Sequence, residues 1–110
     1  MSEKFLIYLK EINKAIDSVK NFILGMNFEQ FKNDDKTSSA VIRKFEIIGE
    51  ATKNIPDKIK EKYPQIPWKD IAGMRDKLIH AYSKVDLNLV WKTIHQRLPE
   101  LKSFIDDILE

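Results

Sequence analysis

Residues 5–23 read FLIYLKEINKAIDSVKNFI, and this stretch decides the fold class. Its apolar residues recur at steps of four and three, which is the period of an α-helix; they are Phe5, Leu9, Ile12, Ile16, Val19 and Ile23. The stripe is narrow, as it is in a helix that packs into a bundle. Ser2 is a suitable residue before the first turn and Gly25 is a suitable stop, so we expect a helix over residues 3–24.

The rest of the chain repeats the helical pattern and shows no alternation typical of strands. Residues 26–37 are expected to be a connection with a short turn of helix after Asn27, and three further helices are expected: residues 37–54, a short helix from Pro56, and residues 67–82. Asp86 is expected to cap a last helix that runs to the C-terminus and is kinked at Pro99, because proline lacks the backbone donor. The sequence therefore predicts one all-α domain over residues 1–110, an antiparallel up-and-down bundle of four to five helices.

Composition excludes several classes of protein. The chain has 110 residues, of which 43% are hydrophobic and 33% charged, a balance unlike that of a disordered or membrane-spanning chain. Its longest apolar run, residues 5–9, is far shorter than the ~20 residues of a membrane helix, and charged residues close to that run leave no signal-peptide pattern. The absence of cysteine excludes disulfides and thiolate chemistry. We therefore expect a cytoplasmic protein that does not act on membranes.

Charge is distributed unevenly although the net charge is only +2. Residues 53–84 hold eight basic and four acidic residues, a local charge of +4, whereas residues 100–110 carry −3. A basic segment of this kind is typical either of a solvated helical face or of a surface that meets an anion. Only three of the nineteen basic residues are arginines, which suggests positions where a planar guanidinium is needed: Arg43, Arg75 and Arg97.

The residues that can carry chemistry lie in residues 68–82, WKDIAGMRDKLIHAY. Arg75 and Tyr82 are seven residues apart, which places them on nearly one stripe of a helix, and Asp76 and His80 are neighbours at a spacing of four. Arg75 and His80 are separated by about 7.5 Å along the axis and about 140° around it. We expect these four polar groups to border one concave surface near the end of the helix.

Such a group has the parts of a metal-independent phosphodiesterase. Histidine exchanges protons near neutral pH, and arginine holds a phosphate with two parallel hydrogen bonds. Asp76 is placed to orient the imidazole of His80, and Tyr82 to stack on a base or to offer its hydroxyl. The sequence has two histidines and no HxxxH or HExxH pattern, so we expect no metal site and no cofactor. In RNA the 2′ hydroxyl supplies an internal nucleophile.

Structural roles for the same residues remain open. An arginine and a histidine five residues apart are common on surface helices, and a tyrosine at a helix end often packs with its hydroxyl in water. Asp76 is also explained as a helical partner of His80 or as a neighbour of Lys77. Trp68 is expected to anchor the start of its helix in the core, and His95 to be a surface or structural residue.

The combination Arg-x4-His-x-Tyr at Arg75, His80 and Tyr82 resembles the signature of HepT-like proteins of the HEPN superfamily. Three further features are similar to that family: residues 48–51, IGEA; Trp68, Ile71, Gly73 and Met74 before the motif; and Val85, Asp86, Leu87, Val90 and Trp91 after it. The resemblance covers essentially the whole chain.

The resemblance implies a HEPN-like helical homodimer in which the motifs of two subunits meet in a cleft. It implies a toxin that cuts RNA without a metal, with Arg75 and His80 as catalytic residues. It also implies a minimal nucleotidyltransferase as antitoxin, which attaches AMP to the motif tyrosine, here Tyr82. Lys77 and Lys84 are candidate RNA contacts beside the motif.

Asp76 departs from the family pattern, because the residue after the arginine is often asparagine there. Its carboxylate either favours the charged imidazolium of His80 or repels phosphate. The non-catalytic alternatives are a helical interaction module that partners a nucleotidyltransferase, and a structural dimer in which Arg75 and His80 form internal pairs.

Overall fold

A computed structural model describes residues 4–80 and 85–110, apart from the side chains of Arg75, Leu78, Ile79 and His80. Within these residues the chain forms seven α-helices and no strand: α1 (Phe5–Phe22), α2 (Phe28–Asn33), α3 (Asp35–Lys53), α4 (Asp57–Lys62), α5 (Trp68–His80), α6 (Leu87–Gln96) and α7 (Leu98–Leu109). The predicted all-α class is confirmed. None of the described helices combines the length and the hydropathy needed to cross a membrane.

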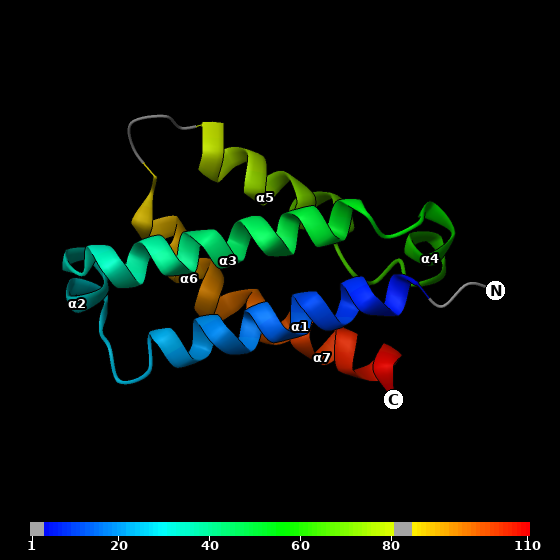
Figure 1. The fold of residues 1–110 in the computed structure, drawn as a ribbon, viewed down its shortest axis with the longest axis horizontal. Coiled ribbons are helices and arrows are strands. Elements are labelled where there is room, and N and C mark those ends of the chain that lie inside the picture. The colour runs from blue at the N-terminus through cyan, green and yellow to red at the C-terminus, as the bar shows by residue number, and fades with distance from the viewer. Residues whose placement is uncertain (1–3, 81–84) are drawn as a thin grey trace.

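α1, α3 and α5 run up and down, each roughly antiparallel to the one before it, and the α6–α7 arm runs back along α5 in the opposite direction (Figure 1). α1 packs against α3 on one side and against α7 on the other, and α3 in turn packs against α5. α6 continues into α7 and returns along the bundle, while the short helices α2 and α4 lie at its opposite ends (Figure 1). This order makes α5 a neighbour of both α3 and the α6–α7 arm.

The stripe that decided the fold class lies in the core. Five of its six residues, from Leu9 to Ile23, are buried, and Phe5 is half-buried against them. The facing residues of α3 are also fully buried, and they are Val41, Phe45 and Ile48. Burial of such side chains contributes about 1.5–3 kcal/mol each, so this interface contributes strongly to the stability of the fold.

Side-chain caps begin several of the helices. Asn27 accepts from the backbone N–H of Gln30, whose side chain accepts from the N–H of Asn27, a reciprocal capping box that starts α2. Asp34 caps α3 through Thr37, and Asp86 caps α6 as predicted. Pro56 is the residue before α4, so it lies one position earlier than a first-turn proline. Ser2, the predicted first cap, lies outside the described residues.

The chain reverses direction after α1 at Gly25. Its φ of +78° lies in the left-handed region that residues with a Cβ rarely adopt. α1 itself ends at Phe22, so the predicted stop lies a few residues beyond the last helical turn.

The prediction of one kinked helix from Asp86 to the C-terminus is wrong in detail. The chain there forms two helices, which separate at Arg97, and Pro99 lies in the first turn of α7. Proline is tolerated in a first turn, where its missing N–H has no helical partner, so the helix restarts just before the proline rather than bending at it. This break and the short α2 raise the number of helices above the four to five expected.

Candidate functional site

Trp68 fixes the start of α5, the helix that carries the motif. Its side chain is only 7% exposed, and its indole N–H donates to the carbonyl oxygen of Tyr63 at 3.0 Å and to that of Lys60 at 3.2 Å. Ile71, one turn later, is also buried. The prediction that Trp68 anchors this helix in the core is confirmed, and the anchor determines where α5 begins.

The structure describes some of the motif residues and not others. The backbone of Arg75 and His80 belongs to α5, so the predicted helical spacing between them holds. Their side chains, and all of Tyr82 and Lys84, lie outside the described residues. The shared concave surface around these groups therefore stays a prediction, and so does the pairing of Asp76 with His80.

Asp76 forms an ion pair that the sequence did not predict. Its carboxylate accepts a hydrogen bond from the ammonium of Lys53 at 3.2 Å, which links the end of α3 to the motif segment of α5. The side chains are 40% and 46% exposed for Lys53 and Asp76 respectively. The two residues are 23 positions apart on different helices, so only the packing of α3 against α5 brings them together.

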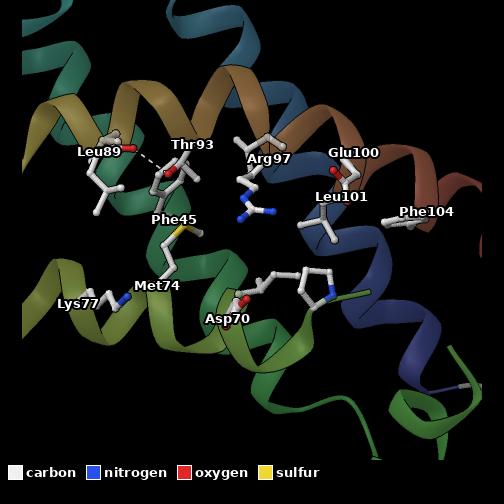
Figure 2. A pocket seen from close by; sticks show the side chains of 14 residues that line it. Phe45, Asp70, Met74, Lys77, Leu89, Thr93, Arg97, Glu100, Leu101 and Phe104 are labelled. Atoms are coloured by element: carbon white, nitrogen blue, oxygen red, sulfur yellow. Dashed lines mark hydrogen bonds between the residues drawn. The ribbon is translucent and has the colours of Figure 1, made fainter. Parts of the chain in front are cut away.

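A groove of about 300 Å³ separates α5 from the α6–α7 arm. Its walls are mainly apolar: Phe45, Pro67, Ile71, Met74, Leu89, Val90, Leu98, Leu101 and Phe104. Lys77, one of the predicted RNA contacts, lies on the α5 wall, opposite Leu89 (Figure 2). Successive residues of α5 thus contact different neighbours, because Asp76 pairs with α3 while Lys77 borders this groove.

Arg97, one of the three arginines, is a groove residue that the sequence did not assign to a site. It lies at the junction of α6 and α7, and its guanidinium extends toward α5 (Figure 2). Asp70 and Glu100 also line this end of the groove, so acidic and basic groups border the same apolar walls. The helix break before Pro99 determines the position of Arg97, and the sequence signal for it was only the rarity of arginine in a lysine-rich chain.

A second hollow, of about 560 Å³, lies between the end of α1 and the α6–α7 arm. His95 lies on its wall and is exposed, which agrees with the expected surface position. Its ring meets the ring of Trp91 edge-on, with 4.5 Å between the centroids. His95 is on a different face of α6 from Thr93, which lines the groove beside α5. His95 therefore does not face the groove that borders the motif helix.

The described residues contain no group of three or more histidine, aspartate or glutamate side chains arranged to hold a metal ion. Metal independence stays a prediction that a cleavage assay with a chelator must test.

Comparison with known proteins finds close relatives over nearly the whole chain. A protein named "Probable ribonuclease HepT" from Thermococcus cleftensis is 52% identical over 95 residues, which are 86% of each chain. A protein named "Putative RNase MJ0125" from Methanocaldococcus jannaschii is 47% identical over 103 residues, or 94% of this chain and 89% of its own. A further RNase-named relative from Caldanaerobacter subterraneus is 43% identical over 94% of this chain and 92% of its own.

No solved structure gives a significant match. The family model described as "Ribonuclease HepT-like" matches residues 12–108, a range that contains α5 and the complete Arg-x4-His-x-Tyr motif. The chain therefore belongs to the HepT-like ribonuclease family.

Proposed function

We propose that this chain is an endoribonuclease that cuts RNA without a metal ion. The observation that carries the proposal is the family match over residues 12–108, which includes the motif on α5. The ribonuclease names of relatives that align over most of both chains give the same substrate class. Arg75 and His80 are the catalytic residues in this proposal.

The chemistry follows from the two side chains. His80 takes the proton from the 2′ hydroxyl of the RNA, and the 2′ oxygen attacks the adjacent phosphorus. The bond from phosphorus to the 5′ oxygen breaks, and that oxygen is protonated by a second imidazole, which the other subunit supplies. Arg75 holds the non-bridging oxygens and stabilises the charge that builds on them. The products are a 2′,3′-cyclic phosphate and a free 5′ hydroxyl.

The active form is proposed to be a homodimer whose contact lies on the groove face of α5, α6 and α7. Three features support this face: its walls are apolar, Leu89 at its edge is 46% exposed, and α5 carries the motif. A two-fold axis beside α5 would bring two motifs together and double the local charge of +4 around them. Lys77 and Lys84 are then proposed to contact RNA phosphates beside the joint cleft.

We further propose that the chain is the cytoplasmic toxin of a toxin–antitoxin pair. The antitoxin is a minimal nucleotidyltransferase, and it transfers AMP from ATP to the hydroxyl of Tyr82 with release of pyrophosphate. The added AMP would be attached two residues from His80 in the sequence. Its size and its negative phosphate would keep RNA out of the site. Intact mass before and after incubation with the nucleotidyltransferase and ATP tests this step, with Tyr82→Phe as the control that should stay unmodified.

Cleavage of RNA by the purified chain in excess EDTA tests the proposed activity. A matched oligonucleotide with one 2′-deoxy nucleotide at the cut site should resist cleavage there, because the internal nucleophile is missing. RNA binding without cleavage would favour the non-catalytic module instead. Cleavage that stops in EDTA and returns with a divalent metal would contradict the metal-free mechanism.

A further inference from the structure

The ion pair between Lys53 and Asp76 joins two helices directly beside the motif. Lys53 is the last residue of α3, and Asp76 follows Arg75 and precedes His80 by one helical turn. Their 3.2 Å contact is an ion pair between α3 and the motif segment of α5. Its position beside the motif distinguishes it from ion pairs elsewhere in the bundle, such as those of Arg43 with Glu46 and of Lys102 with Asp17 and Asp106.

The ion pair between Lys53 and Asp76 is expected to contribute little to the stability of the fold. Both side chains are close to half exposed, and exposed ion pairs contribute little to folding because water and salt screen them. The core beneath α3 and α5 is already held by buried apolar residues such as Phe45, Ile48 and Ile71. The effect of the pair is therefore expected on local charge and on the orientation of the Asp76 carboxylate.

Asp76 raises an electrostatic difficulty if Arg75 binds phosphate. A carboxylate on the residue next to Arg75 repels an approaching phosphodiester. An ammonium at 3.2 Å offsets that charge and holds the carboxylate toward α3. An aspartate at this position needs a nearby positive charge to offset its own, and Lys53 supplies that charge. A neutral polar residue would need no such partner.

We propose that Lys53 is a positioning residue for RNA cleavage, acting through Asp76 to offset its charge and to direct its carboxylate toward α3. The inference rests on the proposed ribonuclease function and adds to it a residue outside the motif. Lys53 touches neither the RNA nor the catalytic side chains in this account. Its removal should weaken RNA binding only while Asp76 carries a negative charge.

A double-mutant cycle tests this dependence. Lys53→Gln should raise KM for a short RNA by about two- to fivefold at low salt, with kcat little changed and with a smaller effect at high salt. Lys53→Arg should restore the wild-type value, because the charge returns. In an Asp76→Asn background the Lys53→Gln change should have almost no effect. Lys14→Gln, which removes the same charge from an exposed position of α1, is the matched control.

Fluorescence anisotropy with the same RNA on a His80→Ala background measures binding without cleavage, so the proposal is tested even if turnover is absent. Circular dichroism and thermal melting of every variant exclude loss of the fold. Equal effects of Lys53→Gln with and without Asp76→Asn, or none at all, would overturn the role of Lys53. Failure of the wild-type chain to cleave RNA would overturn the proposed function instead, and the binding cycle would still decide on Lys53.

Discussion

The indole N–H of Trp68 donates to the backbone carbonyl of Tyr63 at 3.0 Å, across the connection between α4 and α5. This bond joins the first residue of the motif helix to the residue directly after the preceding helix. The same N–H also reaches the carbonyl of Lys60 at 3.2 Å. Trp68 therefore determines where α5 begins and how closely its first turn packs on the core. The motif is positioned relative to this anchor.

Replacement of Trp68 should separate its packing from its hydrogen bonds. Trp68→Phe keeps an aromatic ring but loses the donor, and should lower the free energy of unfolding by about 1 kcal/mol. Trp68→Ala also leaves a cavity and should lower it by about 3–5 kcal/mol. Urea denaturation followed by circular dichroism measures both values, with the exposed neighbour Lys69→Ala as the control. A Phe variant as unstable as the Ala variant would show that the hydrogen bonds dominate.

Substitution of Leu89 should test the proposed dimer face. Leu89→Lys places a charge on the edge of the apolar groove and should convert the dimer to a monomer, as measured by size exclusion with light scattering. Leu24→Lys is the matched control, because Leu24 is 78% exposed but lies by the other hollow. Dissociation by the Leu24 change and not by the Leu89 change would place the dimer contact elsewhere.

Removal of Lys77 should weaken RNA binding in a way that depends on salt. A lysine that contacts phosphate contributes affinity without base preference, so Lys77→Ala should lower affinity similarly for RNAs of different sequence. The slope of log affinity against log salt should fall by about 0.7, the value for one contact to a single strand. Anisotropy titrations at several salt concentrations measure this slope. An unchanged slope would remove Lys77 from the RNA contacts.

Asp34 should make the stability of the bundle depend on pH in acid. The backbone N–H and then the hydroxyl of Thr37 donate to its carboxylate, each at 2.9 Å, and hold the pKa of Asp34 below its ordinary value. A lowered pKa means that the stabilisation is complete above the ordinary aspartate pKa of about 3.9 and is lost as pH falls below it. Thermal melts of the wild type and Asp34→Asn should therefore differ at neutral pH and converge in acid. A constant difference at all pH values would contradict this role of the cap charge.

The fold followed from local patterns in the sequence to a large extent. The stripe from Phe5 to Ile23 predicted α1 and its buried face, because the spacing of apolar residues in a short stretch indicates both the helix and the side of it that is buried. Asn27 and Asp86 likewise began helices as expected. The break at Arg97 was missed, since Pro99 permits either a kinked helix or a restart, and packing of α6 and α7 decides between them.

The candidate site depended more on contacts between distant residues. The motif spacing placed Arg75 and His80 on one helix, and the apolar character of Trp68 predicted its anchor. Lys53 could not be assigned to Asp76 from sequence, because the pair exists only where α3 packs on α5. The position of Arg97 in the groove could not be predicted either, because it depends on where the junction between α6 and α7 lies.

Cleavage of RNA by Arg75 and His80 is the step on which the proposed function depends. Its most direct test is the rate at which highly purified wild-type chain, Arg75→Ala and His80→Ala cleave one RNA in EDTA, with all three shown to be folded. Loss of the proton-transfer group should slow cleavage by at least about a hundredfold, and loss of the phosphate clamp should also give a large decrease. Equal rates in all three proteins would show that Arg75 and His80 are not the catalytic residues.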